Sequence, residues 1–372
     1  MRPMPSIGVL KGKINMKLFT CGPVALYPQV QNVRRKEIMY FRTTEYGAMV
    51  KQIMGELTAL LGRRDESTMI YLACSGSGAM EAAVENSMSA HDKALVINGG
   101  GFGKRFAELL AHHGLQYESL DLKWDEELSE QRLRAYEGRG FTRLFVNLDE
   151  TTSGKLYDLP MLKEFCRRNE LRLIVDTISS FLVDKNDYSD VDLVLFSSQK
   201  GLCCSPGCSF ISLSRDFAEE IIAGKNTSSV NMYFDFRDYF KNMERGQTPY
   251  TPTVMVMYEV SAMLELIKEV GGLEPWIDKI AHKAEIFRTE ALKRGYKIPA
   301  FTKSNMLTPI YFDDTLDASQ FAVKLLQKDY AVCPCGGALS SHLIRVGHAG
   351  NISVNDHLQL LDVMDEVRGE LI

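Results

Sequence analysis

Residues 171–201 have the sequence LRLIVDTISSFLVDKNDYSDVDLVLFSSQKG, which contains two short, mainly apolar runs. The first run, Leu171–Val175, leads directly into Asp176, and the second, Val191–Phe196, is followed four residues later by Lys200. Runs of this length and composition are typical of strands that helices cover on both faces. The stretch therefore predicts two neighbouring strands whose carboxyl ends carry a carboxylate and an amine.

The same alternation of apolar runs and helical patterns extends over the first two thirds of the chain. The other strands are predicted at Met69–Cys74, Ala94–Asn98, Arg143–Leu148 and Cys208–Leu213, and the helices at Gly78–Met88, Lys104–His113 and Leu162–Asn169. This alternation predicts an α/β fold with a mostly parallel central sheet.

The pattern changes after about Val254, where long helical segments replace the short alternating ones. Helices are predicted at Val254–Val270, Pro275–Arg294, Ala318–Lys328 and from Val354 onward, and strands at Leu307–Phe312 and Leu343–Val346. We therefore expect an N-terminal arm at residues 1–18, a large α/β domain at 19–254 and a smaller C-terminal α+β domain at 255–372.

The composition excludes several classes of function. The chain of 372 residues has a net charge of −5 and no long Lys/Arg run, so we expect neither nucleic acid nor an anionic membrane as a partner. No apolar stretch approaches the ~20 residues needed to span a bilayer. The first residues lack the sustained apolar core of a signal peptide, which predicts a cytoplasmic protein.

Eight cysteines raise the question of a metal site. Cys203, Cys204 and Cys208 form one group, and Cys333 and Cys335 form a second. Neither group has the spacing of the paired C-x2-4-C knuckles that bind zinc. We therefore predict no metal, and reduced thiols packed as small apolar groups. The sequence does not assign roles to the individual thiols.

A glycine-rich turn, Ser75–Ala79, follows the first predicted strand and leads into a helix. Such a turn exposes backbone N–H groups at the positive end of a helix, where a phosphate binds well. The turn matches neither the dinucleotide-binding nor the P-loop motif, so a simple strand-to-helix turn is the alternative. For Asp176 the alternative is a helix cap, and for Lys200 an amine that reaches solvent.

Together these features meet the needs of one cofactor. Pyridoxal 5'-phosphate requires an anion cradle, a carboxylate that keeps the pyridine nitrogen protonated, and an amine that bonds to the aldehyde. Ser75–Ala79, Asp176 and Lys200 occur in that order, each at the end of a predicted strand.

At these residues, and from Phe19 to near the C-terminus, the chain resembles the class V aminotransferases of fold type I. The similarity is strongest to alanine–glyoxylate, serine–pyruvate and 2-aminoethylphosphonate transaminases. It is carried by Cys21-Gly22-Pro23, Ser75–Ala82, Asp149–Gly154, Val175–Ser180, Ser197–Gly201 and Arg345–His348. The resemblance implies a large domain built on a mostly parallel sheet and a smaller C-terminal domain.

The resemblance also implies a role for each site residue. It implies a phosphate site at Ser77, Gly78, Ala79 and Gln199, a partner of the pyridine nitrogen at Asp176, and a Schiff base at Lys200. Phe102 matches an aromatic ring that stacks on the cofactor, although relatives often have tryptophan there. Thr152 matches a hydroxyl residue beside the ring oxygen.

Three further residues match positions that bind substrate or the neighbouring subunit. Thr251 matches a threonine that completes the phosphate site of the neighbouring subunit, which implies a homodimer with active sites at its interface. Arg345 matches the arginine that pairs with the substrate carboxylate, for which a guanidinium fork is suited. Gly22 is expected to line the substrate pocket, where a side chain would block access.

The implied activity is transfer of an amino group from a small amino acid to a small oxo acid such as pyruvate or glyoxylate. Alanine, serine and 2-aminoethylphosphonate are the donor types, and the resemblance does not choose between a carboxylate and a phosphonate substrate. Cysteine desulfurase or another lyase of this fold is the alternative, with Cys335 as a sulfur acceptor. Gln199 argues against it, because related desulfurases usually have histidine there. A non-catalytic relative would be expected to lack Lys200, Asp176 or Arg345.

Overall fold

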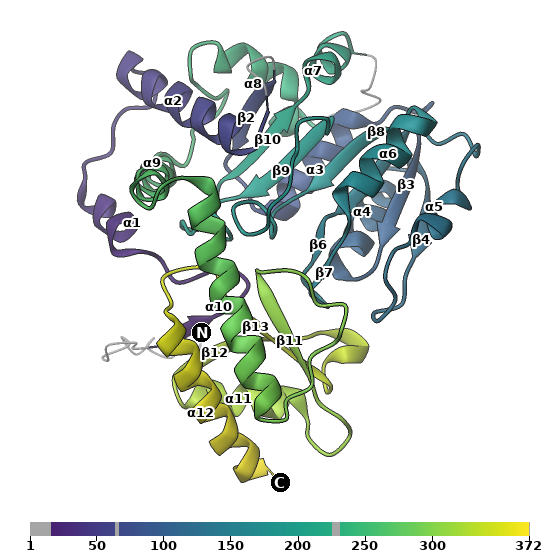
Figure 1. Cartoon of the computed structure of the whole chain (residues 1–372). Helices are drawn as coiled ribbons and strands as arrows, with labels where there is room; N and C mark the ends of the chain where they lie inside the picture. The colour runs from purple at the N-terminus through teal and green to yellow at the C-terminus, as the bar shows by residue number, and fades with distance from the viewer. Residues whose placement is uncertain (1–15, 64–66, 225–230, 372) are drawn as a thin grey trace, which may run out of the picture.

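The computed structural model describes residues 16–63, 67–224 and 231–371, and its centre is a seven-stranded sheet (Figure 1). The strand order is β2-β10-β9-β8-β5-β3-β4. The bounds are β2 Thr68–Leu72, β3 Lys93–Asn98, β4 Gln116–Asp121, β5 Arg143–Asn147, β8 Arg172–Asp176, β9 Leu193–Ser197 and β10 Ser209–Leu213. Only β10 in this sheet runs antiparallel to its neighbours, β2 and β9. The predicted α/β fold is confirmed.

Both faces of this sheet are buried, as the apolar runs predict. In β3, Ala94 and Val96 face the helices α3 (Gly76–Ser87) and α4 (Gly101–His112), together with α7 (Arg215–Ile222) and α8 (Phe236–Met243). Leu95 and Ile97 belong to the opposite core, with α2 (Thr44–Leu60), α6 (Leu159–Asn169) and α9 (Val254–Glu269). The strand β4 was not predicted because it lies at the sheet edge and is only half-buried.

A second sheet of four strands lies below the first in Figure 1, in the order β1-β12-β13-β11. Its strands are β1 Lys17–Phe19, β11 Leu307–Tyr311, β12 Tyr330–Pro334 and β13 Leu343–Gly347. It packs against α10 (Leu273–Lys293), α11 (Ala318–Gln327) and α12 (Val354–Leu371). The N-terminal strand β1 pairs with β12 and so joins this C-terminal sheet. The predicted arm, residues 1–18, lies outside the described residues except for its last three.

Short elements complete the chain. They are α1 Pro28–Asn32, the 3-10 turns η1 Val33–Arg35, η2 Met232–Phe234 and η3 Gly337–Leu339, α5 Glu130–Arg134, and the hairpin of β6 Asp149–Glu150 with β7 Lys155–Leu156. No helix within the described residues has the length and apolarity needed to cross a lipid bilayer.

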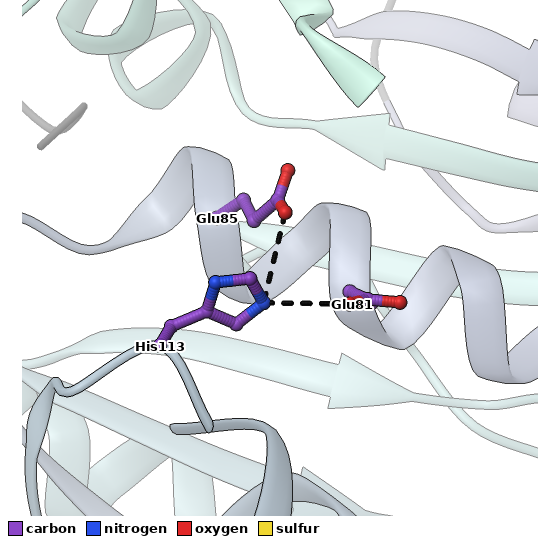
Figure 2. Close-up of side chains that lie close together, drawn as sticks. All are labelled: Glu81, Glu85 and His113. Atoms are coloured by element: carbon purple, nitrogen blue, oxygen red, sulfur yellow. Dashed lines mark ion pairs between the residues drawn. The ribbon is translucent and has the colours of Figure 1, made fainter. Parts of the chain in front are cut away.

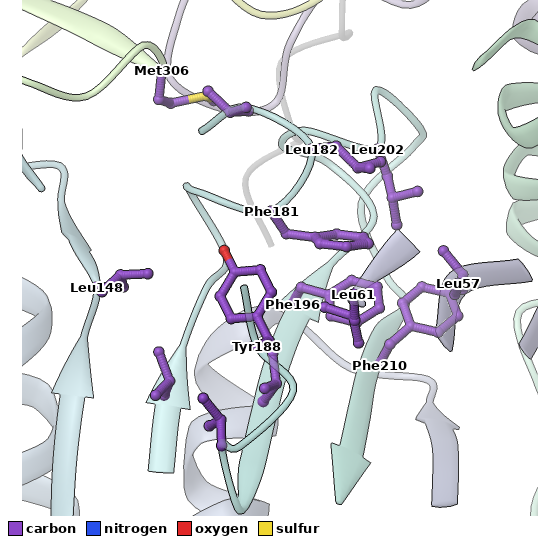
Figure 3. Packing of buried hydrophobic residues seen from close by; sticks show 14 of the residues in the cluster. Leu57, Leu61, Leu148, Phe181, Leu182, Tyr188, Phe196, Leu202, Phe210 and Met306 are labelled. Carbon is purple, nitrogen blue, oxygen red and sulfur yellow. The ribbon is translucent and has the colours of Figure 1, made fainter. Parts of the chain in front are cut away.

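Aromatic side chains support the turn that follows β9. The ring of Phe196 on β9 lies 4.1 Å from that of Phe181 and 5.1 Å from that of Phe210, measured between ring centres (Figure 3). All three are at most 3% exposed. Burial of this kind stabilises the fold at the end of β9 by about 1.5–3 kcal/mol per side chain.

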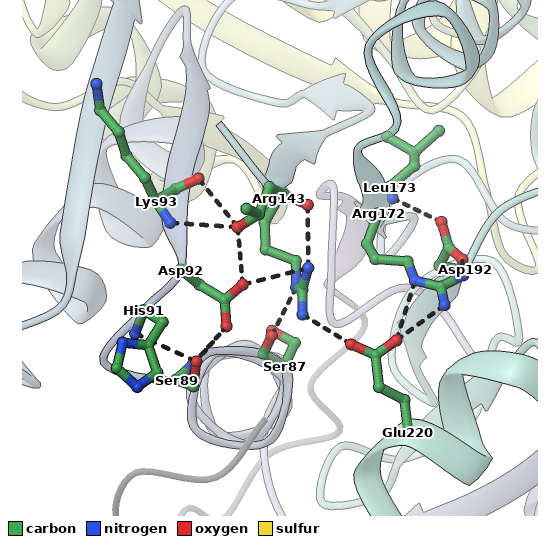
Figure 4. A network of polar contacts seen from close by, with 11 residues as sticks. Ser87, Ser89, His91, Asp92, Lys93, Arg143, Arg172, Leu173, Asp192 and Glu220 are labelled. Atoms are coloured by element: carbon green, nitrogen blue, oxygen red, sulfur yellow. Dashed lines mark hydrogen bonds and ion pairs between the residues drawn. The ribbon is translucent and has the colours of Figure 1, made fainter. Parts of the chain in front are cut away.

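An ionic network ties the amino ends of the strands to α7 (Figure 4). Arg172 Nη1 lies 2.9 Å from Asp192 Oδ1, and Arg172 Nη2 lies 2.8 Å from Glu220 Oε2. Arg143 Nη2 lies 3.0 Å from Glu220 Oε1. These contacts anchor the end of the sheet that is opposite to the carboxyl ends of β5 and β8.

Candidate active site

The predicted site residues follow strands that all run in one direction. Since parallel strands share one carboxyl edge, the turns after β2, β3, β5, β8 and β9 meet at the same edge of the sheet. These turns carry Ser77, Phe102, Thr152, Asp176 and Lys200.

Lys200 is 9% exposed, and its amine makes no hydrogen bond to any described residue. Its Nζ lies 5.9 Å from the ring centre of Phe102. Gly22 lies against the alkyl stem, because a Cβ there would stand 2.5 Å from Lys200 Cδ, and its φ of +136° also favours glycine. Gly22 thus leaves room for the Lys200 side chain.

Asp176 is fully buried at the end of β8. Its Oδ1 accepts a 2.8 Å hydrogen bond from the Ile178 N–H, and its Oδ2 accepts one of 2.9 Å from Asn147 Nδ2. Burial raises the pKa of Asp176 to about 6, although these hydrogen bonds and the charge of Lys200 each lower it. The carboxylate is therefore fixed in place and ionised at neutral pH, ready for a cationic partner.

Asn147 was missed by the sequence analysis. It pairs with Asp176 in the register of β5 and β8, and its own Oδ1 is buried without a hydrogen-bond partner among the described residues. A polar residue that ends an otherwise apolar strand is the signal that would have found it.

The turn before α3 presents polar groups suited to an anion. The N–H of Gly78 donates to Ser75 Oγ at 3.4 Å, and that of Ala79 donates to Ser75 O at 3.1 Å. The N–H groups of Gly76 and Ser77 find no acceptor within the described chain. The amides of Gly78 and Ala79, which the resemblance assigns to phosphate, are thus already engaged in the helix start.

The hairpin after β5 holds the start of α4. Glu150 Oε2 accepts hydrogen bonds from the N–H groups of Phe102 and Gly103 at 3.3 and 3.2 Å. Thr152 Oγ1 accepts from the Gly101 N–H at 3.0 Å. Glu150 is buried and thereby fixes the helix turn that carries Phe102, a role that the motif around it did not reveal.

Arg345 lies directly opposite Cys333 across β13 and β12, so the two side chains share one face. The guanidinium donates to Thr151 O at 2.9 Å and to Pro334 O at 2.6 Å, and its Nε is buried without a hydrogen-bond partner among the described residues. The Arg345 guanidinium is held by these backbone carbonyls, and its remaining N–H groups are available to an anion.

The thiols near Arg345 differ in character. A hydrogen bond with the thiol of Cys21 lowers the pKa of Cys333, and the charges of Arg345 and Lys200 lower it further. Burial raises the pKa of Cys335, whose thiol lies 3.7 Å from Thr152 O. The thiol that the alternative desulfurase interpretation requires is therefore the less easily ionised of the two.

The side chains of two predicted site residues, Gln199 and Thr251, make no hydrogen bond to the other predicted site residues within the described chain. Gln199 Oε1 is buried without a hydrogen-bond partner in the described chain, while the Gln199 carbonyl accepts from the Val24 N–H at 3.3 Å. Thr251 is exposed, and no hydrogen bond joins it to another predicted site residue within the described chain.

A separate cluster connects α3 to the end of α4 (Figure 2). His113 Nε2 lies 3.4 Å from Glu81 Oε1 and 3.6 Å from Glu85 Oε1. When His113 is protonated, these ion pairs tie together the two helices whose first turns border the site.

These groups fit pyridoxal 5'-phosphate. The turn before α3 offers N–H groups and a hydroxyl to a phosphate. Asp176 offers a buried carboxylate to a protonated pyridine nitrogen, and Lys200 offers an amine without a competing acceptor. The fold and this set of groups define a fold type I enzyme that uses pyridoxal phosphate.

Comparison with known proteins identifies the family. The family model for aminotransferase class-V matches residues 27–309, and the chain belongs to this family.

The chain is 28% identical to the soluble hydrogenase 42 kDa subunit of Anabaena cylindrica, over 89% of this chain and 87% of that one. It is 25% identical to serine–glyoxylate aminotransferase of Methylorubrum extorquens, over 90% and 87%. An alanine–glyoxylate aminotransferase structure from Nostoc sp. has the same fold, with a TM-score of 0.89, 24% identity and 95% of each chain covered. The protein is an aminotransferase with pyridoxal phosphate as its cofactor.

Proposed function

We propose that the enzyme transfers an amino group from a small donor of the alanine, serine or 2-aminoethylphosphonate type to a small oxo acid such as pyruvate or glyoxylate. The names of its relatives support this substrate class, since they include serine–glyoxylate and 2-aminoethylphosphonate–pyruvate aminotransferases. The observation that carries the proposal is the buried Lys200 amine without a hydrogen-bond partner among the described residues, at the sheet edge that also bears Asp176.

Each site residue then has a chemical task. When bound, pyridoxal phosphate supplies an aldehyde that bonds to amines and a pyridinium ring that accepts electron density. Asp176 holds the proton on the pyridine nitrogen. Lys200 Nζ is the base and acid of the 1,3-proton shift: it takes the proton from the donor carbon that bears nitrogen, and in the second half-reaction it delivers a proton to the corresponding carbon of the acceptor. Arg345 binds the substrate acid group, beside Gly22. Phe102 stacks on the cofactor ring.

The remaining cofactor contacts are also part of the proposal. Ser77, Gly78, Ala79 and Gln199 hold the phosphate, for which the Gly78 and Ala79 N–H groups would exchange their hydrogen bonds to Ser75. Thr152 donates its hydroxyl proton toward the ring oxygen. The Thr152 oxygen accepts from Gly101, which leaves that proton available.

We also infer a homodimer in which Thr251 reaches the phosphate of the neighbouring subunit. Exposed apolar side chains near Thr251 support this, because Ile38 and Tyr40 line the same hollow as Thr251 and are 68% and 66% exposed. The eight free cysteines support a reducing, cytoplasmic location. The division into domains at residues 19–254 and 255–372 stays a prediction, with β1 contributing to the second sheet.

The test combines chemical trapping with a donor screen. Reduction with borohydride should fix the cofactor to the peptide that contains Lys200, and Lys200→Ala should lose turnover while still binding some cofactor. Alanine, serine and 2-aminoethylphosphonate should each be supplied with pyruvate, glyoxylate or 2-oxoglutarate. Product from none of these pairs, or labelling at the 3% exposed Lys155 in place of Lys200, would contradict the proposal.

A further inference from the structure

Arg105 reaches from α4 to the first turn of α3. Its Nη1 donates a hydrogen bond of 2.7 Å to Ser77 Oγ. Its guanidinium carbon lies 5.8 Å from the ring centre of Phe102, one turn earlier on α4. A single side chain thus contacts both the residue proposed to bind the cofactor phosphate and the ring proposed to stack on the cofactor.

The hydrogen bond fixes how Ser77 can act. A serine hydroxyl has one proton to donate and can accept hydrogen bonds at the same time. Because Ser77 Oγ accepts from Arg105, its own proton remains available, and no described residue accepts it. An anion at the start of α3 would complete this arrangement, since the unpaired N–H groups of Gly76 and Ser77 belong to the same turn.

Arg105 also supplies charge. A phosphate monoester carries about −1.5 to −2 charges at neutral pH. Among the described residues, Arg105 is the only cationic side chain that a hydrogen bond joins to the turn Ser75–Ala79. Hydrogen bonds that involve a charged partner are about twice as strong as neutral ones.

We propose that Arg105 is a cofactor-positioning residue, which holds the Ser77 hydroxyl with its proton free for the cofactor phosphate and holds the Phe102 ring in place for stacking. The inference rests on the proposed function, because it takes Ser75–Ala79 as the phosphate site. Arg105 acts through these two side chains and through its positive charge beside the turn, and not on the reacting atoms.

The test uses two ligands that differ only in the phosphate. Cofactor-free enzyme is titrated with pyridoxal phosphate and with pyridoxal, which lacks the phosphate, in wild type and in Arg105→Gln. The variant should bind pyridoxal phosphate about 10- to 100-fold more weakly, while its affinity for pyridoxal changes much less. The visible circular dichroism of bound cofactor should also decrease, because the Phe102 ring is less firmly held.

Neighbouring substitutions provide the controls. Lys104 is exposed and pairs with Glu108 at 3.2 Å, so Lys104→Gln should leave both affinities within about 2-fold. Arg105→Lys should recover part of the loss, since it keeps the charge without the planar fork. In Ser77→Ala combined with Arg105→Gln, the loss should be smaller than the product of the single losses, because Arg105 acts partly through Ser77.

Three results would overturn the inference. Unchanged affinity for pyridoxal phosphate in Arg105→Gln would show that the contact with Ser77 is incidental. An equal loss of both ligands would show general damage to the packing of α3 on α4. Wild-type protein that binds no cofactor would overturn the proposed function as well, and this result is distinct from the other two because it concerns the unmodified chain.

Discussion

At the scale of single residues, Asp176 links the stability of the fold to the proposed chemistry. A carboxyl group in the unfolded chain has a pKa near 3.9, whereas burial raises that of Asp176 to about 6. Between about pH 4 and pH 6 the folded state therefore binds more protons than the unfolded state. The contribution of Asp176 to the stability of the cofactor-free protein should therefore fall as pH rises through this window and stay lower above it.

Asp176→Asn removes this charge and keeps the local hydrogen bonds. The Asn147 amide can reverse, so that its unpartnered Oδ1 accepts from the new side chain. We expect the cofactor-free variant to gain up to ~3 kcal/mol at pH 7.5 and little at pH 4, measured by urea unfolding. Its kcat should fall by about 10²- to 10³-fold, since the pyridine nitrogen loses its charged partner. A variant that is less stable at pH 7.5, or fully active, would contradict this assignment.

Arg345 and Cys335 separate transamination from desulfuration. Arg345→Ala should lower kcat/KM by an amount that corresponds to ~2–4 kcal/mol of transition-state stabilisation, because the substrate anion loses the guanidinium group that binds it. Cys335→Ser should change activity little, since a hydroxyl can replace the thiol that lies near Thr152 O. Sulfide released from cysteine by the wild type, and abolished in Cys335→Ser, would establish the desulfurase instead.

Sequence patterns predicted the residues that end strands better than the residues that support them. Asp176 and Lys200 follow apolar runs and were found for that reason. Asn147 contacts Asp176 only because β5 and β8 pair in one register, and Arg105 contacts Ser77 only because α4 packs beside α3. Strand register and helix packing depend on the whole fold, so neither contact follows from the spacing of residues.

At the scale of elements, the position of α4 decides where Phe102 and Arg105 lie. Gly103 permits close packing, because a Cβ there would stand 2.5 Å from Ile97 O and 2.8 Å from Asn98 Cα. Gly103→Ala should push α4 away from β3, cost about 1–3 kcal/mol of stability and weaken cofactor binding. Urea unfolding and cofactor titration measure the two effects.

Gly55 on α2 is the matched control for this substitution. A Cβ at this helical position meets no atom within 4 Å. Gly55→Ala should leave cofactor binding unchanged and stabilise the protein by about 0.4–1 kcal/mol, through lower entropy of the unfolded chain. Equal stability of the two variants would show that α4 can shift without strain.

Element boundaries reveal where sequence patterns were weak. The strands of the central sheet were predicted to within about two residues, except for the half-buried edge strand β4. The helices α3 and α4 begin at Gly76 and Gly101, two and three residues earlier than predicted. Glycine is a poor helix former, so the sequence pattern does not indicate the first turns of α3 and α4, which border the site.

At the scale of the whole molecule, the proposed dimer requires that each active site is built from two chains. Thr251 is exposed and lines an apolar hollow of about 600 Å³ together with Ile38 and Tyr40. Apolar surface of this kind often marks a contact between proteins. Light scattering should give twice the mass of one chain, and Thr251→Ala should weaken cofactor binding by ~1.5–3 kcal/mol.

Mixed dimers show whether Thr251 acts on its own chain or on its neighbour. When Lys200→Ala and Thr251→Ala chains are co-expressed, a mixed dimer pairs the intact Lys200 of one chain with the intact Thr251 of the other. If Thr251 serves the neighbouring site, one of the two sites is then complete, and tight cofactor binding with turnover should return in that dimer. The second site of the same dimer carries both substitutions and should stay inactive.

If Thr251 instead serves its own chain, every site keeps one substitution, and the mixture should behave as the sum of the two variants. Full activity in a stable monomer would contradict the dimer itself, because no second chain would then be needed to complete the phosphate site.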